Sequence, residues 1–290
     1  MRVTAESPRH EIDVVLFESP IVRIGRWRCP PDHPHFQDSG PASEHLFVFP
    51  RESVWICHEG ATPFVADPNT ATYYNRGQCY ARRRLSGRGD HCDWFALEAS
   101  AVAETLAAHE PSALDRPSAP FPFTHGPSDE RSYLRQRSVF AHVSREARPD
   151  RLFVEDTVLS VLGAVTKLAY ERRGTEPRPT SMTRRDVDAS EAARDVIARR
   201  FRQDLSLASI ARDVGVSVFH LARVFRQRTG FSLHEYRTQL RLRTALERLA
   251  VSGGDLVDIA LDLGFSSHSH FTSTFRRSFG VTPSAVRASL

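Results

Sequence analysis

The sequence predicts an α+β protein of two domains, in which a strand-rich domain with following helices precedes an all-helical domain. Three observations support this fold class. Short segments rich in β-branched and aromatic residues fill the first hundred residues, two long segments with helical apolar spacing follow, and the last hundred residues repeat a helix, turn and helix twice. A chain of 290 residues is long enough to bury two separate cores.

Five segments of the first hundred residues are typical of β-strands. They are short, and clusters of Pro, Gly, Asp and Asn separate them. Their ranges are 12–17, 21–27, 45–50, 53–60 and 93–98. Strands at such close spacing predict an antiparallel barrel or sandwich.

Two helices are expected next, over 128–148 and 151–173. Residues 176–189 hold Pro, Thr and charged side chains with little apolar content, which predicts an exposed linker. The domains are therefore expected at 1–175 and 190–290. The 151–173 helix carries a long apolar face, made of Leu152, Val158, Leu159, Leu162, Val165 and Ala169.

The last hundred residues contain the first helix–turn–helix copy from Ser206 onward. Ser206 is expected to cap one helix, Gly215 to supply the turn, and Ser217 to cap a second helix. The apolar residues expected to face inward are Leu207, Ile210, Val214, Val218, Leu221, Val224 and Phe225.

The second copy follows the same plan. Asp255 is expected to cap its first helix, Gly264 to turn the chain, and Ser266 to start the second helix. Ser232 and Glu235 have the spacing of a capping box ahead of a long helix that would join the two copies rigidly. The residues expected inward are Ile259, Ala260, Leu263, Phe271 and Phe275.

The positive charge of the chain gathers in this C-terminal third. Residues 191–290 hold 15 Arg, no Lys and 9 acidic residues, a net charge of +6, whereas residues 1–190 carry a net charge of −2. On charge alone, such an imbalance is equally typical of a nucleic-acid partner and of a solvated basic face without a partner. A helix–turn–helix places its second helix in the major groove, so two copies in a basic segment predict binding to double-stranded DNA.

Other classes have less support in the sequence. No apolar run approaches the roughly 20 residues of a membrane span, and the first residues lack the apolar core of a secretion signal, so a cytoplasmic, nucleoid-associated protein is expected. No GxSxG, P-loop or dinucleotide fingerprint appears, so neither an enzyme nor a cofactor is expected. The four cysteines are expected to be thiols.

At these residues the chain resembles the DNA-binding domain of the AraC/XylS family of bacterial transcription regulators. The resemblance spans 191–287 and includes "SLASIARDVGVSVFHLARVFRQRTGFSLHEY" and "DIALDLGFSSHSHFTSTFRRSFGVTPSAVR", in which Pro283 would begin a final short helix. It implies a seven-helix domain whose two reading helices enter successive major grooves.

Residues 1–175 are similar, more loosely, to the cupin-like β-barrel that serves many family members as a sensor and dimerisation domain. The resemblance therefore implies a homodimer, a small-molecule effector whose identity is unknown, and an activator that contacts RNA polymerase. We expect the apolar face of the 151–173 helix to form the dimer, through residues such as Leu162 and Val165, with burial of this face in the core of the same chain as the alternative.

The candidate DNA-binding residues lie on the exposed side of the two reading helices. Arg223 suits bidentate pairing with guanine, Phe219 suits contact with a thymine methyl group, and Arg276 is placed nearer the phosphates. By motif position the family's base readers fall on Phe219, Ala222, Arg223, His268, Ser269 and Ser273, and helical spacing adds Arg226, Thr272 and Arg276.

A metal- or thiol-responsive sensor is the alternative function. Its ligands would come from Cys29, His33, His35, Cys57, His58, Cys79, His91 and Cys92. However, no CxxC pair is present, and neighbours such as Cys57 and His58 point to opposite faces of a strand.

Two features of the first domain have two interpretations each. The arginines at 82–84 either sit at a barrel mouth for an anionic effector or form a solvated strand edge. A set of aromatic residues either lines a pocket or belongs to the core: Trp55, Phe64, Tyr73, Tyr74 and Trp94.

Overall fold

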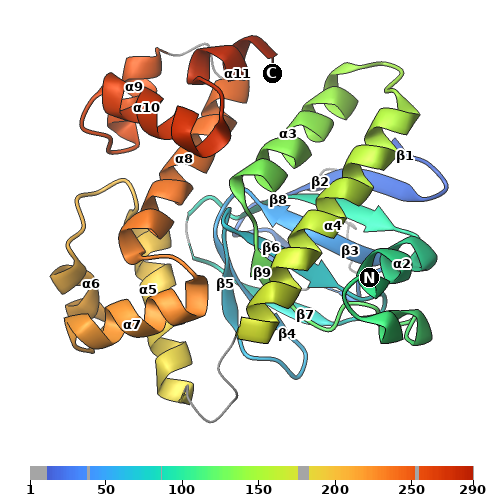
Figure 1. The fold of residues 1–290 in the computed structure, drawn as a ribbon, viewed down its shortest axis with the longest axis horizontal. Helices are drawn as coiled ribbons and strands as arrows, with labels where there is room; N and C mark the ends of the chain where they lie inside the picture. Colours follow the sequence, from blue (N-terminus) through green and yellow to red (C-terminus); the bar gives the residue numbers. More distant parts are fainter. Residues whose placement is uncertain (1–11, 38–39, 86, 176–182, 252–254, 290) are drawn as a thin grey trace, which may run out of the picture.

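The computed structural model describes residues 12–37, 40–85, 87–175, 183–251 and 255–289. Within them the fold is α+β, as the sequence predicts (Figure 1). The strands are β1 (Asp13–Glu18), β2 (Val22–Cys29), β3 (His45–Pro50), β4 (Val54–His58), β5 (Phe64–Ala66), β6 (Thr70–Tyr74), β7 (Tyr80–Arg83), β8 (Asp90–Leu97) and β9 (His125–Pro127). The helices of this part are α2 (Ala99–Ala107), α3 (Glu130–Arg145) and α4 (Arg151–Thr175), with short 3-10 turns η1 (Pro34–Phe36) and η2 (Pro111–Asp115).

The strands form two antiparallel sheets. One has the order β1-β2-β8-β3-β6-β9 and the other the order β5-β4-β7. The five predicted strands correspond to β1, β2, β3, β4 and β8. Prediction missed β6 because all five of its residues are buried, which removes the alternation that marks a half-exposed strand.

Strand register gives the larger sheet two different faces. Ile24, Phe95, Phe47 and Tyr73 are paired in a row across β2, β8, β3 and β6. Because side chains alternate along a strand, this row faces the helices and the neighbouring row, which includes Trp94, faces the smaller sheet. The sheet thus supports a helical layer on one side and a cavity on the other.

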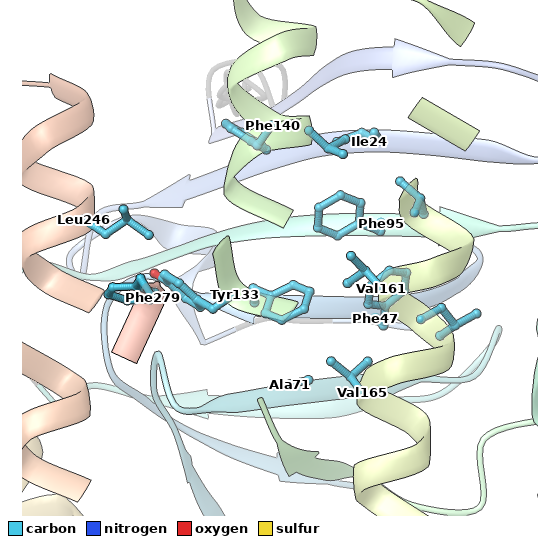
Figure 2. Close-up of a cluster of buried hydrophobic side chains, with 14 of the residues drawn as sticks. Ile24, Phe47, Ala71, Phe95, Tyr133, Phe140, Val161, Val165, Leu246 and Phe279 are labelled. Atoms are coloured by element: carbon cyan, nitrogen blue, oxygen red, sulfur yellow. The ribbon is translucent and has the colours of Figure 1, made fainter. Parts of the chain in front are cut away.

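Helices α3 and α4 cover the first face, as Figure 2 shows for Phe140, Val161 and Val165 opposite the sheet residues. Leu162 and Val165 are fully buried there. The prediction that these two residues form a dimer face is therefore wrong, because a helix packed on its own sheet has the same apolar spacing as one packed on a partner. Leu152 lies outside the core and is 77% exposed.

The remaining helices form the C-terminal part. They are α5 (Arg184–Arg200), α6 (Leu207–Val214), α7 (Val218–Thr229), α8 (Leu233–Val251), α9 (Leu256–Asp262), α10 (His268–Phe279) and α11 (Pro283–Ser289). Pro283 begins the last helix, as predicted. None of the described helices is long and apolar enough to span a membrane.

Helix α5 begins inside the predicted linker. Thr183 and Asp186 form a reciprocal capping box, in which each side chain accepts a hydrogen bond from the other residue's backbone nitrogen. The linker prediction is therefore wrong for 184–189, where Asp186 and Ala189 are buried. Residues 176–182 lie outside the described part, and the division into domains stays a prediction.

The hydrophobic core is continuous between the parts of the chain before and after the predicted linker. One cluster of buried apolar side chains runs from the large sheet through α3 and α4 to α8, α9, α10 and α11. Figure 2 shows Leu246 of α8 and Phe279 of α10 beside Tyr133 of α3. The expectation of two separate cores is thus replaced by one core that both parts share, with a smaller cluster around α5 to α7.

Candidate nucleic-acid interface

Helices α6 and α7 form the first helix–turn–helix unit with the predicted caps. The Ser206 and Ser217 hydroxyls each accept a hydrogen bond from the backbone nitrogen three residues on. Gly215 has a φ of 76°, a left-handed conformation that ends α6 and turns the chain. The inner face of α7 is buried, through Leu221, Val224 and Phe225.

The outer face of α7 holds four of the predicted DNA-binding residues. Phe219 is 88% exposed, which is unusual for a phenylalanine. Arg223 and Arg226 are also exposed, while Ala222 is half-buried and shares with Arg226 the hollow between α7 and the start of α8. The first unit therefore presents an apolar tip and two cations on one helix.

On this face, both ring nitrogens of His220 already contact neighbouring side chains. Its Nε2 lies 3.0 Å from Oδ1 of Asp186 at the start of α5. Its Nδ1 lies 3.5 Å from the guanidinium of Arg223. Hydrogen bonding of this kind orients Arg223 without neutralising it, so the arginine stays available to an anion.

Helices α9 and α10 form the second unit. Asp255 caps α9 by accepting from the backbone nitrogen of Val257, as predicted. Helix α10 is capped by Ser267, whose hydroxyl accepts from the backbone nitrogen of His270, rather than by Ser266, whose hydroxyl lies 3.0 Å from Nδ1 of the His270 ring. The inner faces are buried as predicted, through Ile259, Ala260, Leu263, Phe271 and Phe275.

The outer face of α10 holds the other five predicted residues. Ser269, Ser273 and Arg276 are exposed. His268 and Thr272 are half-buried, with Nε2 and Oγ1 3.4 Å apart. The phenylalanines of this segment fill the core, and the small polar residues between them form a surface that another molecule can approach closely.

Helix α8 joins the two units and fixes their geometry. The predicted capping box is confirmed, since Ser232 and Glu235 exchange side-chain to backbone hydrogen bonds of 2.8 and 3.2 Å. Arg241 of α8 donates to the carbonyl of Phe201 at the end of α5 and to that of Gly264 in the turn of the second unit, both at 2.7 Å. Burial lowers the pKa of Arg241 to about 10, so it stays charged near neutral pH.

The same helices are docked on the sheet by buried arginines that sequence reasoning missed. Arg243 of α8 is 1% exposed and donates to the carbonyls of Pro68 and Ser128. Arg194 of α5 donates to Tyr236 at 2.9 Å and to Thr70 at 2.9 Å. The only sequence signal is an arginine on the apolar face of a helix, and it does not identify the partner.

A cavity of about 470 Å³ lies between the two sheets. Its wall contains Trp27, Tyr74, Tyr80 and Trp94, together with the charged pair of Arg82 and Asp90 at 3.2 Å. The Arg82 guanidinium lies 4.4 Å from the centroid of the Trp27 ring. An aromatic cavity with an internal charged pair suits a small amphipathic molecule.

The structure separates the sequence features that were assigned to an effector site. Arg82 is buried in the cavity wall, whereas the arginines at 83 and 84 are exposed. Tyr74 and Trp94 line the cavity, while Phe64 and Tyr73 belong to the core. The Trp55 indole instead donates to Asp195 of α5 at 2.8 Å.

The cysteines and histidines of the alternative sensor do not gather. Within the described ranges, no three His, Cys, Asp or Glu side chains lie where they could hold a metal ion. The cysteines are free thiols, and burial raises the pKa of Cys29 and Cys92, which lowers their thiolate fraction. The residues named for this alternative thus remain scattered over β2, β4, β8 and the loops.

Two helix–turn–helix units held by one continuous helix define a DNA-binding protein of the bipartite kind. Residues 210–289 match a family model described as a helix-turn-helix domain. The regulatory protein SoxS of Salmonella typhimurium is 40% identical over 85 residues, which cover 29% of this chain and 79% of SoxS. The virulence regulon transcriptional activator VirF of Yersinia enterocolitica is 28% identical over 154 residues, 53% of this chain and 52% of VirF.

Among solved structures, an AraC-type regulator from Chromobacterium violaceum is 37% identical and covers 34% of this chain and 89% of its own, with a TM-score of 0.34. ToxT from Vibrio cholerae is 14% identical over 94% of this chain and 99% of its own, with a TM-score of 0.36. The chain belongs to the AraC/XylS family of bacterial transcription regulators. It is a DNA-binding transcription regulator.

Proposed function

We propose that this regulator recognises a specific operator by placing α7 and α10 in successive major grooves. The observation that carries the proposal is shared by both helices: each buries an apolar face and exposes a polar one. The proposed contacts are Phe219, Ala222, Arg223, Arg226, His268, Ser269, Thr272, Ser273 and Arg276.

The proposed contacts differ in role. Arg223 lies in the middle of α7, where its guanidinium is 3.5 Å from His220, and it pairs with a guanine through its two-pronged guanidinium. Arg276 lies in the last turn of α10 and contacts a phosphate. Loss of Arg223 then lowers the binding free energy on the operator by about 1–3 kcal/mol and relaxes the preference at one or two base pairs. Loss of Arg276 weakens binding to all DNA sequences to a similar extent.

The test is binding of Arg223→Ala and Arg276→Ala to the operator and its single-base variants at several salt concentrations. Arg276→Ala lowers the salt slope by about one unit. Arg148→Ala removes the same charge from an exposed loop and serves as the control. Equal loss by Arg223→Ala on every base variant would contradict base reading.

We further propose an effector-responsive activator that contacts RNA polymerase, with residues 1–175 as a cupin-like sensor and dimerisation domain and 190–290 as the DNA-binding domain. The cavity between the sheets supports a small amphipathic effector because it is aromatic and lies in the part joined to α5 and α8. Trp94→Ala is the test, since it changes the effector response of transcription but leaves operator binding without effector intact. Sedimentation of the full chain tests the homodimer.

A further inference from the structure

A second hollow, of about 250 Å³, lies next to the cavity between the sheets, with which it shares the lining residues Trp27 and Cys92. Its walls come from β2, the turn after β3, β8 and helix α8. Arg26 and Arg28 of β2 project into it, on the same side of the strand as Ile24. The hollow therefore lies between the sheet and α8, the helix that joins the two helix–turn–helix units.

This hollow carries an excess of positive charge. Five arginines and two glutamates line it: Arg26, Arg28, Arg51, Arg88, Arg248, Glu52 and Glu247. Burial lowers the pKa of the remaining titratable imidazole, His91, which is therefore neutral near pH 7. Counted over these lining residues, positive charges exceed negative ones by three, and the Asp93 and Asp262 carboxylates that contact Arg51 and Arg248 reduce this excess without removing it. The remaining positive charge raises the local concentration of anions.

Three of the arginines are held by neighbouring carboxylates. Arg51 bonds Glu247 and lies 3.4 Å from Asp93. Arg88 lies 2.9 Å from Glu52. Arg248 of α8 lies 3.2 Å from Asp262, and so the helix side of the wall is also fixed.

Arg26 and Arg28 differ from these three. In the part of the chain that the structure describes, neither guanidinium makes a side-chain hydrogen bond or an ion pair of 4 Å or less. Burial lowers the pKa of Arg28, and the neighbouring charges of Arg26 and Arg51 lower it further. The Asp93 carboxylate opposes this lowering, but the two guanidiniums lie on the same face of β2 and repel each other.

We propose that this arginine-lined hollow binds a small multivalent anion that carries phosphate or carboxylate groups. Guanidinium forks match both groups through paired charge-assisted hydrogen bonds. The volume admits a small anion and excludes a DNA duplex. A bound anion would reach Arg26 and Arg28 on the sheet and α8 on the other side, and would stabilise the docked position of α8.

The proposal does not depend on how the regulator reads DNA, because no residue of α7 or α10 lines the hollow. Calorimetric titration of the full chain with pyrophosphate and with citrate, at constant ionic strength, tests it. The variant Arg26→Gln/Arg28→Gln should bind about tenfold more weakly than wild type, since it loses two charge-assisted partners. Arg131→Gln/Arg145→Gln removes two exposed charges elsewhere, from α3, and should bind like wild type.

Circular dichroism serves as the folding control. Both double variants are expected to be folded because none of the four arginines has a buried hydrogen-bond partner among the described residues. Binding of pyrophosphate alone assigns a phosphate ligand, and binding of citrate alone assigns a carboxylate ligand. The proposal is overturned if wild type binds neither anion at millimolar concentration, or if both double variants bind equally well. Operator affinity is measured separately, so that failure here is distinct from failure of the DNA-binding proposal.

Discussion

At the scale of single residues, the docking of α8 depends on a charge placed in the interior. Arg243 is fully buried, and its guanidinium donates to two backbone carbonyls and lies 4.9 Å from the Tyr133 ring centroid. Such a cation is tolerated because both terminal nitrogens of the guanidinium have carbonyl acceptors, although its Nε is buried without a hydrogen-bond partner among the described residues. Its removal leaves two carbonyls without a donor.

We therefore expect Arg243→Ala to lower the free energy of unfolding by on the order of 3 kcal/mol. Arg131→Ala, at an exposed position of α3, should change it by less than about 0.5 kcal/mol. Urea unfolding followed by circular dichroism measures both. Arg243→Met keeps most of the volume without the donors, so a stability equal to wild type in that variant would show that packing alone matters.

His58 links stability to pH. Its ring lies among Phe64, Tyr74 and Tyr80, and burial lowers its pKa from 6.5 to about 4. Between these two values the unfolded chain binds a proton that the folded chain does not, so stability is complete above pH 6.5 and falls as the pH drops toward 4.

Thermal unfolding of wild type and His58→Gln between pH 4 and 7 checks this expectation. The stability of wild type should fall with decreasing pH by about 3 kcal/mol more than that of the variant. His45, His91 and His125 have pKa values lowered by burial too, so they act in the same direction in both proteins. Parallel pH profiles would mean that His58 is not the group responsible.

At the scale of elements, the turns of the two helix–turn–helix units differ in how tightly they are packed. Gly215 and Gly264 both have a left-handed φ, of 76° and 81°. A Cβ on Gly215 would meet nothing within 4 Å, whereas one on Gly264 would overlap the carbonyl oxygen of Arg202 and lie 2.6 Å from the Arg241 guanidinium.

Both alanine substitutions therefore carry the left-handed strain of about 1–2 kcal/mol, but Gly264→Ala must also displace Arg241. We expect Gly264→Ala to be clearly less stable than Gly215→Ala and to weaken operator binding more, because Arg241 ties the second unit to the end of α5. Calorimetry and operator titration measure the two effects. Equal losses in the two variants would contradict the role given to Arg241.

Helix α4 tests the corrected assignment of its apolar face. Leu162→Ala should cost about 2–5 kcal/mol because the side chain is completely buried against the sheet. Leu152→Ala, at a position that is 77% exposed, should be nearly neutral. A Leu162→Ala protein of unchanged stability but altered sedimentation would restore the dimer interpretation.

Local chemistry explains which elements were predictable. Caps such as Ser206, Ser217 and Asp255, and the Ser232 and Glu235 box, depend on residues within one turn, so the sequence alone located α6 to α9 closely. Helix α10 was displaced by one residue because two adjacent serines were both able to cap. The exposed faces of α7 and α10 followed from the same spacing.

Contacts between distant segments were not predictable. The bonds of Arg194 to Thr70 and of Arg243 to Ser128 join residues more than a hundred positions apart, and no local pattern encodes them. The cavity between the sheets likewise depends on β6 and β7, which were not foreseen. The exposure of the candidate DNA contacts was therefore predictable from sequence, whereas the cavity and the buried contacts of α5 and α8 required the fold.

At the scale of the whole molecule, α7 and α10 are held in position by α5 and α8, which pack against the strands. Helix α5 contacts the sheet through Arg194 and Asp195, and α8 contacts it through Arg243 and the shared core. A ligand that shifts the sheet relative to α8 would thus act on both units at once. Interfaces of this kind couple sites when they have two arrangements.

The shared core makes a thermodynamic prediction about the whole chain. Because one apolar cluster passes from the sheet into α8, α9 and α10, the protein should unfold in a single calorimetric transition with equal calorimetric and van't Hoff enthalpies. Arg194→Ala should broaden or split that transition, since it removes the donors to Tyr236, Thr70 and Val65 that join α5 and α8 to the sheet. Arg200→Ala, which removes an exposed pair with Asp213 of α6, should leave one sharp transition. Two separate transitions in the wild-type protein would show that the sheet part and the DNA-binding part fold independently, and that the buried arginines only orient them.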